Sequence, residues 1–266
     1  MPKNVVISGG TSGMGRATAL ERLDRGDTVT VIGSSPSTLP SHPNLHTIQA
    51  DLSSIAEVER VVTHLSRHYD AIDALALFAN RPSPHRRETP DGLEYTFALY
   101  YLSRYLLSHR LAPLLDAAPH PVIVNVAGVG TTAGRIHWDD PQLTRGYGQI
   151  RAQLQAGRAN DLLGVDFATR SSSKARYLLY HPGFTRSGVD NHPSPVVRAS
   201  LKLLGKLFAR PVTASAKPIV EWIDHPPPDP LTAIDRGKKL DLSLTTLAPT
   251  DAARLASYTE SLLSRL

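Results

Sequence analysis

Short apolar runs alternate with longer amphipathic stretches along the whole chain. The short runs are rich in β-branched residues, as in Val5-Val6-Ile7, which is typical of buried strands. The longer stretches repeat apolar residues at the helical period, as in residues 55–69. The expected strands cover residues 4–8, 28–32, 45–49, 73–80, 121–126, 176–181 and 240–242. Five helices are expected at residues 55–69, 91–115, 196–208, 214–223 and 250–263. Two more are expected to start at residue 16 and near residue 151. This alternation predicts an α/β fold with a doubly wound parallel sheet and a ligand at the carboxyl ends of the strands.

Local signals mark the helix starts and the extent of the domain. Asp51, Ser53 or Ser54 is expected to cap the helix at residue 55, and Thr250 or Asp251 the last helix. The chain shows neither repeats nor a boundary between two domains, so residues 1–266 are expected to form a single domain.

The first apolar run stops at a glycine-rich turn, and helix-forming residues follow at once. Glycines at positions 9, 13 and 15 allow positive φ and a close approach of the backbone to a bulky anion. The helix that follows directs free N–H groups and the positive end of its dipole at the same place. Strand, turn and helix together predict a Rossmann-type dinucleotide site. The alternative is a tight turn of the same sequence pattern that binds no ligand. The expected cofactor contacts in this turn are Gly9, Thr11, Ser12, Gly13, Met14 and Gly15.

The end of the second expected strand bears on the choice of cofactor. An acidic residue there would bind the ribose hydroxyls and favour NAD, but the residues are Gly33-Ser34-Ser35. Ser34 and Ser35 are neutral donors suited to a 2′-phosphate, so NADP(H) is favoured over NAD(H). The alternative is that these serines only form a turn.

Composition narrows the function classes. Cysteine is absent among the 266 residues, which excludes disulfides and thiolate metal sites and fits a reducing compartment. No metal site is expected. No apolar run approaches the ~20 residues that cross a bilayer, and no apolar run typical of a signal peptide follows Met1-Pro2-Lys3. The net charge of +5 is diffuse, which suits an anionic ligand and does not indicate nucleic acid. We therefore expect a cytoplasmic protein that binds no membrane.

Ser8-Gly9-x-x-x-Gly13-x-Gly15 resembles the signature of the short-chain dehydrogenase/reductase family. The likeness covers most of the chain, and the Asp91-Gly92-Leu93-Glu94 segment resembles the retinol-dehydrogenase-like branch. The resemblance implies a small-molecule substrate, a substrate lid at residues 188–225 that includes the basic amphipathic stretch 196–208, and a homodimer or homotetramer. It further implies cofactor contacts from Asp51, Leu52, Ala79, Asn80, Pro182, Gly183, Thr185 and Ser187.

The family's catalytic residues are the point at which the resemblance fails. Relatives carry a Tyr and, four residues later, a Lys; the phenol gives its proton to a carbonyl oxygen and the ammonium lowers the phenol's pKa. One alignment pairs Tyr147 with Arg151. A second alignment matches more residues and is preferred; it places Gln153 and Gly157 at the Tyr and Lys positions. Two more family residues, an Asn and a Ser, then align with Tyr100 and Gly128.

Three functions stay open on these residues. The first is an NAD(P)(H)-dependent oxidoreductase for a small hydrophobic carbonyl or alcohol, whose proton donor is Tyr147, Tyr100 or a water held by Gln153. The second is a redox-neutral enzyme on the same fold, and the third a catalytically silent NADP-binding protein. His181 is an alternative acid, and Thr131 or Thr132 an alternative source of the lost serine hydroxyl.

Overall fold

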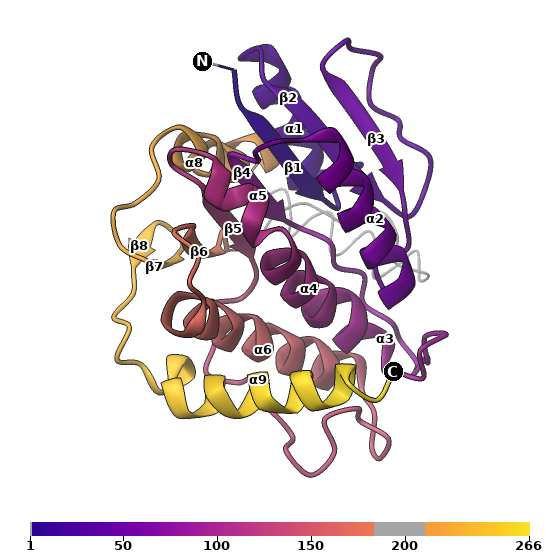
Figure 1. The fold of residues 1–266 in the computed structure, drawn as a ribbon. Coiled ribbons are helices and arrows are strands. Elements are labelled where there is room, and N and C mark those ends of the chain that lie inside the picture. The colour runs from indigo at the N-terminus through magenta and orange to yellow at the C-terminus, as the bar shows by residue number, and fades with distance from the viewer. Residues whose placement is uncertain (1, 184–210) are drawn as a thin grey trace.

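The computed structural model describes residues 2–183 and 211–266, and these form α-helices around one mostly parallel sheet (Figure 1). The sheet has eight strands in the order β3-β2-β1-β4-β5-β6-β7-β8, and β8 alone runs antiparallel to its neighbour. The strands are β1 (Asn4–Ser8), β2 (Thr28–Gly33), β3 (Leu45–Gln49), β4 (Ala74–Leu77), β5 (Val122–Val126), β6 (Arg176–His181), β7 (Leu231–Asp235) and β8 (Lys238–Lys239). The predicted doubly wound parallel sheet is confirmed.

Side chains alternate between two apolar layers, one on each face of the sheet. In β1, Val5 and Ile7 join the layer under α1 and α8, whereas Val6 joins the layer under α2, α4 and α6. A parallel sheet covered on both faces needs such continuous apolar strands. The helices are α1 (Gly13–Asp24), α2 (Ile55–His68), α3 (Tyr95–Phe97), a π-helical turn (Ala98–Leu102), α4 (Ser103–Arg110), α5 (Ala112–Ala117), α6 (Gln149–Arg170), α8 (Val212–Asp224), a 3₁₀ turn (Thr245–Leu247) and α9 (Pro249–Leu263), which lies along α6.

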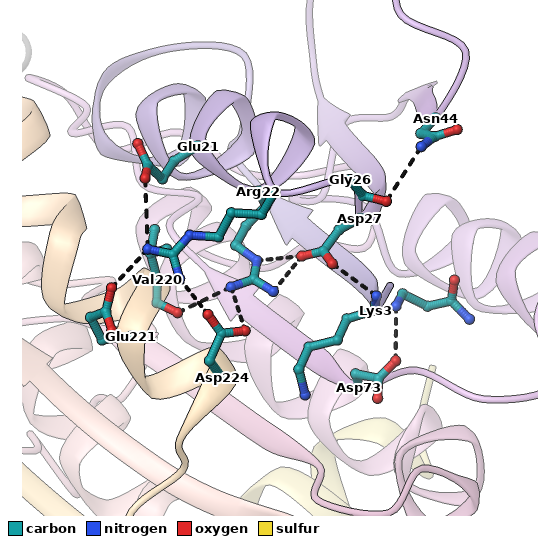
Figure 2. A network of polar contacts seen from close by, with 12 residues as sticks. Lys3, Glu21, Arg22, Gly26, Asp27, Asn44, Asp73, Val220, Glu221 and Asp224 are labelled. Atoms are coloured by element: carbon teal, nitrogen blue, oxygen red, sulfur yellow. Dashed lines mark hydrogen bonds and ion pairs between the residues drawn. The ribbon is translucent and has the colours of Figure 1, made fainter. Parts of the chain in front are cut away.

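Buried charge joins α1 to α8. The Arg22 guanidinium on α1 pairs with Asp27, which precedes β2, and with Asp224 at the end of α8, at 2.8 Å (Figure 2). Asp27 also accepts the backbone N–H of Lys3 at 2.8 Å. These ion pairs and hydrogen bonds therefore hold α1, α8 and the residues before β1 and β2 together. They lie at the end of β1 opposite the glycine-rich turn.

The prediction of a strand at residues 240–242 is wrong. The strand beside β6 is Leu231–Asp235, which the sequence analysis missed. Arg236 and Gly237 then take positive φ and turn the chain back through β8. Leu240 donates its N–H to Ala233 and packs inward, but the residues after it leave the sheet. The Leu-Asp-Leu alternation is therefore not that of a strand.

Three expected helix starts also differ. Ser54 precedes α2 but its side chain forms no cap, and the Ile55 N–H instead donates to the Asp91 carboxylate at 3.0 Å. Ala248, not Thr250 or Asp251, precedes α9, with Pro249 in its first turn. The single helix expected from residue 91 begins only at Tyr95, because the Glu94 carboxylate caps the chain there. It then passes through a π-helical turn and is interrupted at Leu111, two residues before Pro113.

Several expectations lie outside the described residues. They are the Thr185 and Ser187 contacts, the helix at 196–208 and most of the lid at 188–225. Of the lid region, only residues 211–225 are described, and they belong to α8 and the residues that flank it. Within the described parts of the chain, no helix combines the length and apolar character that crossing a bilayer requires.

Candidate functional site

The glycine-rich turn between β1 and α1 lies against the ends of two other strands. Gly9 takes φ +71°, and a Cβ on it would stand 2.7 Å from the Ala79 nitrogen, just beyond β4. A Cβ on Gly15 would clash with the Gly9 carbonyl oxygen, and one on Gly33 would lie 2.6 Å from the Thr11 methyl group. Only glycine allows this backbone approach, so the turn forms a narrow concave surface at the carboxyl ends of the strands.

The first turn of α1 is free to bind an anion. Ser12 precedes the helix in an extended conformation, but its side chain caps no N–H group. The N–H groups of Gly13, Met14 and Gly15 have no acceptor within the helix, and no acidic residue lies in this turn. Because the helix dipole adds positive potential here, the turn fits the pyrophosphate of a dinucleotide.

A cavity of about 230 Å³ continues from this turn along the end of β2. Thr11 and Ser35 line it, and Ser34 accepts a hydrogen bond from the Gln49 amide at 3.4 Å. Its full lining is Thr11, Val31, Ser35, Pro36, Ser37, Thr47, Ile48 and Gln49, which includes no charged side chain. Asp51 lies beyond β3, where its carboxylate accepts the N–H and hydroxyl of Ser53, and Leu52 is buried.

The other end of the site lies where α6 meets the residues after β4. Asn80 and Gln153 exchange two amide hydrogen bonds, of 3.0 and 3.2 Å. The structure thus brings Gln153 of α6 to Asn80, beyond the carboxyl end of β4, and Asn80 directly follows Ala79, which packs against Gly9 of the glycine-rich turn. A paired amide can orient a water molecule, but it has no proton to release near neutral pH.

Helix α6 carries neither a tyrosine nor a lysine. Among the described residues, a Cβ on Gly157 would meet no atom within 4 Å, and one on Gly128 would meet only the Thr131 hydroxyl at 3.5 Å. No described side chain therefore fills either position, where the preferred alignment places the family's Lys and Ser. No phenol and ammonium pair can form within this helix.

Tyr147 and Arg151 do not come together. The Tyr147 hydroxyl donates to the Ser83 carbonyl oxygen at 2.8 Å, and burial raises its pKa. The Arg151 guanidinium instead donates to the Gly146 carbonyl at 2.9 Å and contacts His137. Each side chain binds a different loop, so they form no acid–cation pair.

Tyr100 lies in the π-helical turn before α4, and its ring packs against Ala127 and Ala156. Burial raises the pKa of its phenol, and the positive charge of Arg104 opposes that rise. The Arg104 guanidinium carbon lies 4.7 Å from the centre of the Tyr100 ring. Arg104 itself is fully buried, and it donates to the carbonyl oxygens of Ala79 and Val126 at 3.0 and 2.9 Å.

Sequence reasoning missed Arg104 and two buried asparagines, Asn125 and Asn160, that connect it to the π-helical turn. Asn125 accepts from Arg104 and donates to Asn160 at 3.1 Å, and Asn160 donates to the Tyr100 carbonyl oxygen at 2.7 Å. The signal that could have found Arg104 is its helical spacing from the apolar Leu107 and Leu111, because a charge on an apolar face is seldom buried without a role.

The remaining candidates occupy other parts of the strand ends. His181 binds Asp235 at 2.8 Å between the ends of β6 and β7, and Gly183 takes φ +84° beyond Pro182. Thr132 lines a larger cavity of about 800 Å³, together with Gly134, Arg135, Ile136, His137, Trp138, Asp139, Arg158, Thr245, Thr246, Asp251 and Arg254. Across the described ranges, no three His, Asp or Glu side chains gather as metal ligands would.

Comparison with known proteins agrees with this geometry. The sequence profile described as short chain dehydrogenase matches residues 3–139. An oxidoreductase from Saccharomyces cerevisiae is 28% identical, over 71% of this chain and 63% of its own length. Retinol dehydrogenase 13 from Homo sapiens is 26% identical, over 71% and 61%. The chain thus spans about three fifths of the length of these curated relatives.

Solved structures share the fold. A protein from Mycobacterium paratuberculosis superposes with a TM-score of 0.73 at 22% identity, and the match covers 98% of this chain and 92% of that one. The 3-alpha-hydroxysteroid dehydrogenase of Pseudomonas sp. B-0831, solved with NADH, gives a TM-score of 0.68 at 19% identity, over 88% and 95%.

Proposed function

The chain belongs to the short-chain dehydrogenase family, and from this premise we propose that it is an NAD(P)(H)-dependent oxidoreductase with an unusual proton donor. Its reaction would be the reduction of a carbonyl group or the oxidation of an alcohol on a small hydrophobic metabolite. The observation that carries the proposal is the glycine-rich turn that leads into the uncapped start of α1, because Gly9 packs so closely on Ala79, beyond β4, that only glycine fits there.

Named residues would hold the dinucleotide. The turn from Gly9 to Gly15 would bind the pyrophosphate through backbone N–H groups, and the cavity beside Ser35 would take the adenosine end. Asp51, Asn80 and Gly183 lie beyond the carboxyl ends of β3, β4 and β6, on both sides of the glycine-rich turn that follows β1, as contacts to the two ends of the dinucleotide would. When bound, the nicotinamide ring supplies or accepts the hydride.

We propose NADP(H) as the preferred form, because hydroxyl groups and no carboxylate line the cavity at the end of β2. Fluorescence titration with NADPH and NADH tests this preference. Ser35→Asp places a negative charge where the 2′-phosphate would lie, so it should weaken NADPH binding about tenfold or more and change NADH binding much less. Ser35→Asn is the neutral control. Equal effects of both substitutions on both coenzymes would contradict the preference.

The proton donor is proposed among Tyr147, Tyr100 and a water oriented by Gln153. General acid help contributes about 10²–10⁴-fold to such a reaction, so an oxidoreductase without the usual pair is physically possible. Tyr147 would first have to leave the Ser83 carbonyl oxygen, whereas Gln153 already lies beside Asn80.

Absorbance of NADPH at its reduced-nicotinamide band, followed with a panel of ketones and aldehydes, tests the activity. Substrate-dependent consumption supports the proposal. The triple variant Gly128→Ser, Gln153→Tyr, Gly157→Lys would rebuild the family's residues in positions where the structure leaves space at both glycines. Its activity should exceed that of a control in which Gly157→Leu replaces Gly157→Lys, since leucine fills the space without charge.

A second function is favoured by the absence of Tyr and Lys from α6. If the protein binds the dinucleotide and consumes none with any carbonyl, it is a redox-neutral enzyme or a silent NADP-binding protein. A homodimer or homotetramer is also proposed from the family resemblance, and a cytoplasmic location from the absence of cysteine. Light scattering of the purified protein measures the subunit number.

A further inference from the structure

We propose that Tyr100 and Arg104 form the acid–cation pair of this site, on the helix that faces α6. Tyr100 is the proton donor, and Arg104 is a positioning residue whose guanidinium stabilises the phenolate left after donation. This inference rests on the proposed oxidoreductase function and names the group that serves it.

The Tyr100 ring packs between β5 and α6, near the positions at which the preferred alignment places the family's Ser and Lys. Its apolar neighbours are Ala127 and Ala156, which precede Gly128 and Gly157 in the sequence. Among the described residues, no atom lies within 4 Å of a Cβ placed on Gly157. The ring is 8% exposed, and its hydroxyl makes no hydrogen bond to any residue in the described ranges. No described residue therefore occupies the phenol O–H, which we infer donates to the bound substrate.

Arg104 is an uncompensated positive charge beside this phenol. It follows Tyr100 by four residues, which puts both side chains on one face of the helical segment. Its partners among the described residues are two backbone carbonyl oxygens and the Asn125 amide oxygen, and its Nε has none. Burial lowers its pKa to about 10, which shows the cost of keeping the charge there. A phenolate at Tyr100 would offset that cost.

Buried asparagines hold the pair in place. Asn125 accepts from the guanidinium and donates to Asn160, which donates to the Tyr100 carbonyl oxygen at 2.7 Å. The bond from Asn160 reaches the carbonyl within the π-helical turn, a geometry often found at functional sites. Both the charged group and the backbone of the donor are therefore fixed from β5 and α6.

The charged groups that face Tyr100 act in opposite directions. Arg104, on the same helical segment, lowers the pKa of the phenol, whereas Asp161 on α6 and burial raise it. The net direction is upward, so the phenol stays protonated near neutral pH and is ready to donate. In reduction, the Tyr100 O–H bond breaks and its proton bonds to the substrate's carbonyl oxygen as the carbonyl carbon receives the hydride. Water then returns the proton to the phenolate.

Fluorine NMR of protein labelled with difluorotyrosine tests the pair without cofactor. The chain has nine tyrosines, and Tyr100→Phe identifies the signal of interest. In the Arg104→Gln variant, the Tyr100 titration should move upward by about one pH unit or more. An unchanged or lower titration point in the folded variant overturns the pair.

Tyr101 keeps the test decisive if Arg104→Gln does not fold. It is the next residue and is more deeply buried than Tyr100. Burial raises its pKa well above the ordinary value, and its hydroxyl contacts Thr259 rather than a cation. In the wild-type protein Tyr100 should titrate at lower pH than Tyr101. The reverse order overturns the proposal.

Kinetics test the donor itself. Tyr100→Phe should reduce kcat about 10²–10⁴-fold with little change in KM, whereas the control Tyr101→Phe should leave kcat close to that of the wild type. A loss of kcat in Tyr147→Phe together with an unchanged kcat in Tyr100→Phe overturns the inference and leaves the oxidoreductase function intact. If the wild type binds NADPH and reduces no carbonyl, the proposed function fails and the donor role falls with it, whatever the NMR titration shows.

Discussion

Arg22 and Arg104 are the two bulkiest of the fully buried side chains, and their charges are treated differently. Arg22 pairs with the carboxylates of Asp27 and Asp224, which tie α1 to α8 (Figure 2). Arg104 has only neutral oxygens as partners among the described residues, and an aromatic ring against its face. Most N–H groups of both guanidinium groups donate hydrogen bonds. Only the charge of Arg22, however, is neutralised by carboxylates among the described residues.

The two arginines lie toward opposite ends of the parallel strands. Arg22 is near the start of β1, where Asp27 accepts the Lys3 backbone N–H. Arg104 donates to Ala79, just beyond β4, and to Val126, the last residue of β5. Ligands of doubly wound sheets bind at the carboxyl ends. The uncompensated charge is therefore at the end where chemistry is expected, and the neutralised charge is at the end that only needs stability.

The largest expected effect is that of Arg22→Met. It leaves Asp27 buried without its cation, and breaking a buried ion pair in this way costs about 3–5 kcal/mol. Urea unfolding measures the loss. The folded fraction should bind NADPH as the wild type does, since Arg22 lies away from the glycine-rich turn. A loss of coenzyme affinity in the folded variant would contradict this separation of the two ends.

Arg104→Met should cost less, about 1–3 kcal/mol, because it leaves acceptor oxygens without donors but no unpaired carboxylate. The same unfolding experiment measures it. A loss as large as that of Arg22→Met would mean that the charge of Arg104 is compensated after all, and the contrast between the two arginines would disappear.

The sequence predicts the geometry of the glycine-rich turn better than the surroundings of the proposed proton donor, for a physical reason. The glycine-rich turn is local: strand, glycines and helix are consecutive from Asn4 to Asp24, so their letters alone indicate the geometry. The place of Arg104 depends on oxygens of Ala79 and Val126, which the fold brings together from two other strands. No periodicity in the helix could reveal those partners.

The errors in the fold have the same origin. Leu240-Asp241-Leu242 alternates as a strand does, but Leu242 is exposed and Leu240 packs near Gly130. β7, at Leu231–Asp235, was hidden by the prolines before it, yet its register beside β6 is continuous. Asp91 caps α2 from a distance of 36 residues in sequence, which no cap signal near residue 55 contains.

Asp161 is a third buried ionisable group. It is less well paired than Arg22 but, unlike Arg104, has a side chain of opposite charge nearby. Arg158 lies 3.4 Å from one carboxylate oxygen, and the other oxygen has no partner in the described chain. Burial outweighs this weak pair and raises the pKa of Asp161 to about 7. Because the unfolded value is about 3.9, the folded state binds more protons, and stability falls as pH rises from about 4 to about 7.

Asp161→Asn should remove this dependence. Relative to the wild type, the variant should gain about 1.4 kcal/mol or more in unfolding free energy between pH 5 and pH 8, the equivalent of one pKa unit. Urea unfolding of both proteins at several pH values measures the difference. A difference that is constant with pH would show that Arg158 neutralises Asp161 as Asp27 neutralises Arg22.

Arg25→Ala should have the smallest effect and sharpens the comparison most directly, because Arg25 shares the carboxylate of Asp224 with Arg22. Arg25 is 35% exposed and also contacts Glu221 at 2.7 Å. Exposed pairs of this kind contribute about 0.2–1 kcal/mol, and salt screens them. Urea unfolding in low and high salt should therefore show a small loss that shrinks with salt. If Arg25→Ala lowered the unfolding free energy as much as Arg22→Met, burial would not explain why the Arg22 ion pairs contribute more to stability than exposed ones.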